Sequence, residues 1–127
     1  PKGVLAVADW NRRDPSDGAM SRNERWVMRQ LLHQWAHPEF ASIKGFRHNL
    51  EASQQQRGEV ITDDWAMATL PSWIDSIVEG MRGPGAVLGL GPRAVLQGLR
   101  ETPTLLLMHW AFANGLMQFG VFRLKPR

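Results

Sequence analysis

Hydrophobic and charged side chains follow separate stripes along the segment from Ser21 to His37. Val27, Leu31 and Trp35 recur every four residues, which places them on one side of an α-helix. The pattern predicts an amphipathic helix with a buried apolar face and an exposed basic face. The basic stripe comprises Arg22, Arg25, Arg29 and His33.

Both ends of this helix are marked in the sequence. Ser21 with Glu24 three residues later is the pattern of a capping box, in which the hydroxyl and the carboxylate accept hydrogen bonds from free backbone amides. Pro38 disfavours helical geometry at the residue before it. We therefore expect the helix to run from about Arg22 to Ala36.

Two short segments near the chain ends have the pattern of β-strands. Residues Gly3–Trp10 are a run of small and β-branched apolar residues. Residues 121–127 alternate apolar and basic side chains, as an edge strand does. We expect these two strands to pair with each other or to cover an edge of the fold.

The other apolar positions recur at helical spacing, and proline and glycine divide them into short helices. Pro71 and Pro103 suit the first turn of a helix, and Gly80–Pro92 has the composition of a glycine-rich linker. The fold class that this pattern predicts is mainly α, a compact bundle of about five helices in a single domain spanning residues 1–127. The expected further helices cover residues 40–46, 63–70, 71–79, 92–101 and 103–118.

The most apolar stretch extends from Thr104 to Phe122 and approaches the length of a membrane span. His109, Asn114 and Gln118 interrupt it, and each of these polar groups would be costly in hydrocarbon. We therefore expect a helix at the centre of a packed core and no membrane span.

Composition and charge are those of a folded domain. The 127 residues carry a formal net charge of +3. The pI is near 10.2 because the chain has no tyrosine or cysteine to titrate. The high pI is therefore weak evidence for nucleic-acid binding. Without cysteine, neither a disulfide nor a thiolate metal site can form. With no signal peptide, this favours the cytoplasm. The first residue is Pro1, which favours a processed product or a domain of a longer protein.

Candidate metal and carboxylate sites have little support. His33 and His37 have the spacing of two imidazole ligands on one helix, but Gln34 stands where zinc proteases carry their catalytic glutamate. Asp63 and Asp64 lie at a predicted helix start, where acidic groups meet the positive end of the helix dipole, so capping explains them. We expect no metal and no cofactor.

Two further patterns argue against familiar phosphate-binding sites. Residues 63–80 have the helix–break–helix outline of a DNA-reading unit, but Asp75 and Glu79 on its second helix would repel phosphates. The glycine-rich residues 83–92 lack the Lys-Ser/Thr of a P-loop.

The Arg-rich face carries the functional prediction, because no catalytic motif supports an enzyme. The first hypothesis is a non-catalytic interaction or assembly module that presents this face to an acidic protein partner. The alternative is a nucleic-acid-binding domain that uses the same face, and an enzyme of unknown type ranks third. A homo-oligomer is compatible with each. The predicted binding residues are Arg22, Arg25, Arg29, His33, Lys44, Arg47 and His48.

Overall fold

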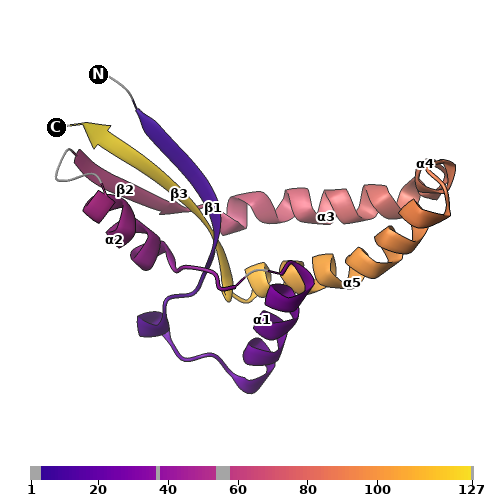
Figure 1. The fold of residues 1–127 in the computed structure, drawn as a ribbon, viewed down its shortest axis with the longest axis horizontal. Helices are drawn as coiled ribbons and strands as arrows, with labels where there is room; N and C mark the ends of the chain where they lie inside the picture. The colour runs from indigo at the N-terminus through magenta and orange to yellow at the C-terminus, as the bar shows by residue number, and fades with distance from the viewer. Residues whose placement is uncertain (1–3, 37, 54–57, 127) are drawn as a thin grey trace.

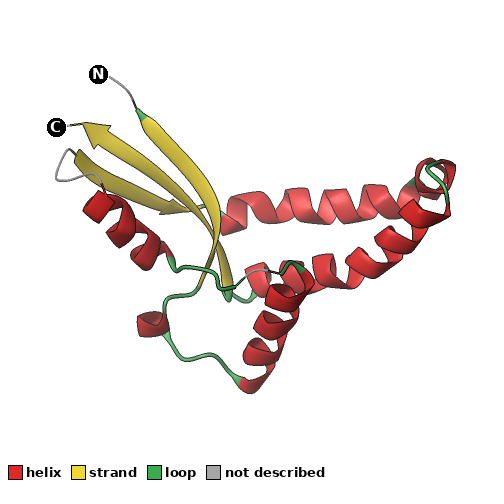
Figure 2. Ribbon diagram, in the orientation of Figure 1, coloured by secondary structure: helices red, strands yellow, loops and turns green. Residues whose placement is uncertain are grey.

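The computed structural model describes residues 4–36, 38–53 and 58–126. Figure 1 shows a sheet with helices on both faces and a long helical arm, and Figure 2 shows the same elements by type. In chain order the elements are β1 (Leu5–Arg12), the 3-10 helix η1 (Pro15–Asp17), α1 (Arg22–Gln34), α2 (Ile43–Ser53), β2 (Gly58–Asp64), α3 (Ala66–Arg82), α4 (Pro84–Gly89), α5 (Pro92–Ala113) and β3 (Met117–Pro126).

The three strands form one sheet in the order β1-β3-β2. β3 pairs antiparallel with both neighbours, so β1 and β2 run parallel to each other. Parallel strands need a long crossover, which η1, α1 and α2 provide. The register sets Leu124 of β3 between Leu5 and Val60, and it sets Phe119 opposite Trp10. The two terminal segments therefore pair as predicted, but the C-terminal one is the central strand.

Different helices cover the two faces of the sheet. Phe122 and Trp10 project from opposite faces, as their register requires. The ring of Phe122 contacts Phe46 of α2, with centroids 4.5 Å apart. On the other face, Trp10 contacts Trp35 beside α1 and Trp73 of α3, with centroids 5.3 and 5.9 Å apart. The aromatic side chains therefore fix both helical layers to the sheet.

The main core lies between this second face and helices α1, α3 and α5. The C-terminal half of α5 is its central element, as predicted for the last helix. The other half of α5 leaves the core and, with α3 and α4, forms a projecting arm (Figure 1). The buried core residues are Val27, Met28, Leu31, Phe40, Ala66, Met108, Ala111, Phe112, Leu116 and Met117.

The predicted bundle of about five helices is wrong, because the sheet is a full structural layer. Residues 58–64 form β2, whereas the sequence pattern predicts a helix start at Asp63 and Asp64. β-Branched residues precede these aspartates and favour a strand once β3 lies beside them. Asp64 lies just before Trp65, the N-cap residue of α3, and its Oδ1 accepts a hydrogen bond from the amide of Ala66 at 2.9 Å.

Pro71 and Pro103 lie inside α3 and α5 and do not begin new helices. A proline inside a helix removes one backbone hydrogen bond, and packing of the two helices against each other offsets that loss. The predicted pairs of short helices are therefore single helices of 17 and 22 residues. The predicted linker at Gly80–Pro92 contains the end of α3 and all of α4.

Helix α1 confirms the first sequence pattern. Both hydrogen bonds of the capping box form, with Glu24 N donating to Ser21 Oγ at 3.1 Å and Ser21 N donating to Glu24 Oε2 at 2.8 Å. Val27 and Leu31 are buried, and Trp35 is half-buried at the helix end. The basic side chains that were expected to be exposed are exposed, namely Arg22, Arg25 and Arg29.

Asn11 joins two segments beneath the sheet. Its buried side chain donates to the carbonyl of Ala41 at 3.2 Å and accepts from the amide of Gly120 at 3.1 Å. A Cβ at Gly120 would overlap Asn11 Oδ1 and lie 2.8 Å from the Phe122 ring.

We expect Gly120→Ala to lower the free energy of unfolding by about 1–3 kcal/mol in urea titrations. Gly89→Ala, which adds a Cβ in open space, is the control, and equal stability of the two variants would contradict this packing.

Asp14 links η1 to the start of α2. Its carboxylate accepts hydrogen bonds from the hydroxyls of Ser16 and Ser42, each at 2.6 Å. These hydrogen bonds, with one from the backbone of Ser16 and the positive charge of Lys44, lower the pKa of Asp14 from 3.8 to about 2.

Acid should therefore weaken this link. Because the pKa of Asp14 is lower in the folded state, its stabilising contribution is present above pH 3.8 and is lost as the pH falls towards 2. Ser42→Ala removes one donor, so the pKa of Asp14 should rise and the loss of stability over this pH range should become smaller. NMR titration of the side-chain carboxyl carbon measures the pKa, and an ordinary pKa in the unmodified protein would contradict the prediction.

Candidate functional site

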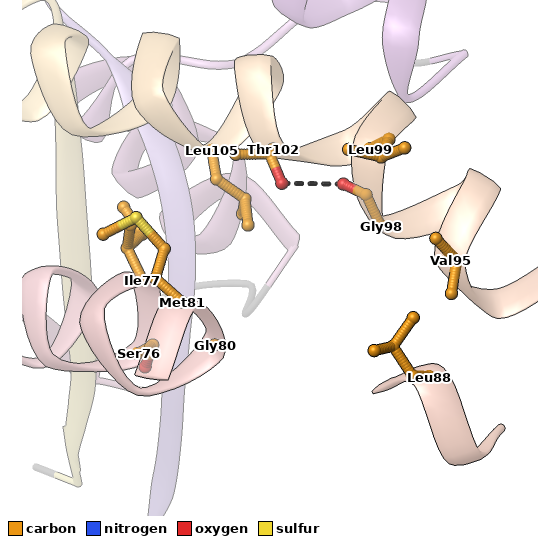
Figure 3. A pocket seen from close by; sticks show the side chains of 10 residues that line it. All are labelled: Ser76, Ile77, Gly80, Met81, Leu88, Val95, Gly98, Leu99, Thr102 and Leu105. Carbon is orange, nitrogen blue, oxygen red and sulfur yellow. Dashed lines mark hydrogen bonds between the residues drawn. The ribbon is translucent and has the colours of Figure 1, made fainter. Parts of the chain in front are cut away.

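An apolar groove lies between α3 and α5 in the arm (Figure 3). Its volume is about 320 Å³, which is within the range of small-molecule sites. Ile77 and Met81 of α3 lie opposite Leu105 of α5, and Leu88 of α4 lies near Val95 at the far end (Figure 3). The lining residues are Ser76, Ile77, Gly80, Met81, Leu88, Val95, Gly98, Leu99, Thr102 and Leu105.

The two hydroxyl groups of the groove are satisfied within their own helices. Ser76 Oγ donates to the carbonyl of Ser72, and Thr102 Oγ1 donates to the carbonyl of Gly98, each at 2.7 Å. All the other lining residues are apolar or glycine. The groove therefore presents a hydrocarbon surface to whatever occupies it.

Two glycines give the groove its width. Gly80 of α3 and Gly98 of α5 both line it, and a Cβ built on either meets no atom within 4 Å. Inside a helix, glycine lowers helix stability by roughly 1 kcal/mol relative to alanine. The two glycines therefore keep the groove open at some cost in helix stability.

A second hollow of about 340 Å³ extends the groove towards the sheet. The two hollows share Ser76, Ile77 and Leu105, so they form one continuous track. The inner end reaches Trp10, near the end of β1. The inner hollow is lined by Trp10, Thr69, Ser72, Trp73, Ser76, Ile77, Leu105 and Phe119.

The predicted basic residues of α1 do not lie in this track. Arg25 and Arg29 line a separate hollow of about 410 Å³ beside Arg12, whose Nη2 is 3.0 Å from Glu39 Oε1. His33 lines another hollow of about 530 Å³, against the outer side of α5. The basic stripe of α1 is therefore divided between two surfaces.

The other predicted basic residues lie on α2, which covers the opposite face of the sheet. Lys44 Nζ is 2.9 Å from Asp17 Oδ1, and Arg47 Nε is 2.8 Å from Glu51 Oε1. The carboxylates raise the pKa of both bases. Arg22 and His48 are exposed, and a binding role for the seven basic residues remains a prediction.

His37, the second imidazole of the candidate metal pair, lies outside the described residues. Within residues 4–36, 38–53 and 58–126, no three His, Cys, Asp or Glu side chains are grouped as a metal site would need. In the same part of the chain, no helix combines the length and the apolarity that crossing a membrane requires.

The sequence pattern does not predict the apolar track, because it assigns Gly80 to a linker and Gly98 to the interior of a helix with no further role. A weaker signal was available in α5, where Gly98, Thr102 and Leu105 recur at i, i+4 and i+7. This spacing places them on one helix face, and a glycine within such a face leaves a gap. The partner face on α3 is set by tertiary packing, which the spacing alone does not give.

Comparison with known proteins supplies a chemical context for the track. No protein-family profile matches the chain. Over 123 residues, which are 97% of this chain, it is 50% identical to 2-methyl-6-phytyl-1,4-hydroquinone methyltransferase from Synechocystis sp. (strain ATCC 27184 / PCC 6803 / Kazusa). The matched part is 39% of that enzyme, so the chain spans about two fifths of the length of this relative.

This similarity overturns the functional prediction from the sequence. The prediction favoured a non-catalytic interaction module with a basic surface, with nucleic-acid binding as the alternative, whereas the relative is an enzyme named for a small-molecule substrate. The Arg-rich stripe misled the prediction because charged side chains on a helix face need no ligand when water solvates them.

Proposed function

We propose that this chain forms part of a methyltransferase that acts on a hydroquinone carrying a long isoprenoid chain. The observation that carries the proposal is the 50% identity, over almost the whole chain, with an enzyme whose named substrate is a phytyl hydroquinone. The apolar track between α3 and α5 supports it independently, since a phytyl chain needs a hydrocarbon surface.

The chemistry of the track favours one orientation of such a substrate. Burial of a hydrocarbon chain is worth about 0.8 kcal/mol per CH₂ group. Among the described residues, none that lines the groove is charged. The aromatic ring suits the inner hollow, where Trp10, Trp73 and Phe119 offer ring faces and edges. In the proposal, the hydroquinone lies near the sheet and its chain extends towards Leu88.

In the proposed reaction, a methyl group moves from a sulfonium donor to a nucleophilic atom of the hydroquinone. That atom forms the new bond to carbon and loses a proton, and the sulfonium becomes a neutral thioether. The described helices contribute by binding and orienting the substrate, because a correctly placed nucleophile reacts faster than a free one.

The outer edge of β1 supports a place for this chain in a larger sheet. Apart from a parallel bridge between Arg12 and Ser42, no strand within the described residues pairs with that edge. Val4 and Leu5 are exposed beside it, and an apolar edge of this kind readily pairs with a further strand. We propose that in the complete enzyme this edge is paired, so that the carboxyl end of β1 borders a shared ligand site.

Methyl transfer tests the proposal directly. Protein produced from its complete natural gene is incubated with S-adenosylmethionine labelled in its methyl group and with 2-methyl-6-phytyl-1,4-hydroquinone. We expect label in the extracted lipid, and kcat/KM about 100-fold lower for the hydroquinone without its phytyl chain, which corresponds to roughly three or four buried CH₂ groups. Absence of label under conditions in which the Synechocystis enzyme is active would reject the proposal.

A further inference from the structure

The end of the helical arm lies far from the sheet (Figure 1). Large apolar side chains on this part of the chain are exposed. Their exposed fractions range from 64% to 75%, although these are residue types that normally lie inside a protein. Large apolar side chains that are exposed on one part of a folded domain mark a site of interaction with a protein, a ligand or a membrane. We call this cluster the arm tip, and it comprises Met81, Leu88, Leu90, Leu96 and Leu99.

Basic residues outnumber acidic ones around the arm tip. Residues 79–101 include three arginines, with Glu79 and Glu101 at the two ends of the segment. Arg93 and Arg100 are exposed on α5. Arg82 ends α3, and its guanidinium is 3.7 Å from Glu79 in a pair that is itself open to solvent. Apolar side chains with arginines among them are the composition of a segment that lies in the interface of an anionic membrane.

We propose that the arm tip docks into the surface of an anionic lipid bilayer. Leucine and methionine side chains enter the boundary between headgroups and acyl chains, and the arginines pair with lipid phosphates. The described helices are not of the kind that spans a membrane, so the contact is interfacial. Together with the proposed function, this contact places the outer end of the groove at the bilayer, where a phytyl hydroquinone dissolves.

Flotation with lipid vesicles tests the docking without any measurement of methyl transfer. The complete protein is mixed with vesicles of phosphatidylcholine alone or with one third phosphatidylglycerol. We expect it to float with the anionic vesicles and to bind neutral ones at least tenfold more weakly. The double variant Leu90→Glu/Leu96→Glu should reduce the partition coefficient on anionic vesicles at least tenfold. Neither residue lines the groove, so its methyl transfer in detergent should match that of the unmodified protein.

Met67→Glu is the matched control, because Met67 is 72% exposed on α3 but lies at the opposite end of that helix from the arm tip. It should bind vesicles like the unmodified protein. The docking proposal is overturned if the unmodified protein stays with the vesicle-free fraction. It is also overturned if the double variant binds anionic vesicles as well as the unmodified protein, or if Met67→Glu loses as much binding as the double variant. Self-association that the double variant abolishes, without vesicle binding, would also overturn it. Vesicle binding without methyl transfer would reject the proposed function and leave the docking intact.

Discussion

Replacing Phe112 with alanine should lower the free energy of unfolding by about 3–5 kcal/mol, the largest loss of stability that we expect for this chain. The side chain is 2% exposed in the C-terminal half of α5. Its ring centroid lies 6.0 Å from that of Trp73 in α3. Truncation would remove a large apolar surface and leave a cavity between two long helices, which cannot close around it without losing other contacts.

Leu106→Ala is the matched control, since Leu106 lies on the same helix and is 51% exposed. Truncation of Leu106 to alanine should lower the free energy of unfolding by less than about 1 kcal/mol. Urea denaturation followed by circular dichroism gives both values. If Phe112→Ala were no more destabilising than Leu106→Ala, the core could not be centred on α5.

Filling the groove at Gly98 should reduce the use of a long-chain substrate with little loss of stability. The Gly98→Leu side chain starts in open space and extends into the groove. It would displace several methylene groups of a bound chain, at about 0.8 kcal/mol each, so we expect kcat/KM for the phytyl hydroquinone to fall about 10- to 100-fold. Because leucine is a better helix former than glycine, the free energy of unfolding should be unchanged or slightly higher.

Gln97→Leu provides the control for this variant. It adds a leucine one position away on α5, where Gln97 lines the polar hollow beside α1 and not the groove. Its kinetics should match those of the unmodified protein. The hydroquinone without a phytyl chain should react equally well with both variants. An equal loss for both substrates in Gly98→Leu would show that the variant disturbs the catalytic site and not the site for the chain.

The elements predicted well from the sequence are those whose signals are local. Helix α1 begins at Ser21 because that hydroxyl and Glu24 satisfy amides within one turn, and its apolar stripe needs no knowledge of the partner. The strand character of the N-terminal segment also follows from its own residues. These signals correctly gave the burial of Val27 and Leu31.

The parts predicted wrongly depend on contacts between distant residues. β2 forms because β3, some sixty residues later, supplies its hydrogen-bonding partner, with Ile61 beside Arg123. The local sequence at Pro71 and Pro103 predicts helix starts, and the packing of α3 against α5 explains why the helices continue through them. At the two prolines, local propensity loses to tertiary packing.

The candidate site was the least predictable part. Its surface is made mainly by uncharged side chains of α3 and α5, and neither helix alone carries a recognisable motif. The predicted binding surface consists of basic residues, which are easily recognised in a sequence. In the structure, Lys44 and Arg47 are paired with neighbouring carboxylates. An apolar site of this kind becomes visible only when the facing residues of both helices are known.

Photochemical labelling tests most directly whether the track between α3 and α5 holds the chain of a phytyl hydroquinone. The probe is the hydroquinone with a diazirine at the far end of its phytyl chain, and mass spectrometry of the digested protein locates the attachment. We expect labelled peptides from α4 and the N-terminal half of α5, including Leu88 and Leu99, with labelling suppressed by unmodified substrate and by Gly98→Leu. Attachment mainly to α2, or labelling of α4 and α5 that unmodified substrate does not suppress, would contradict the assignment.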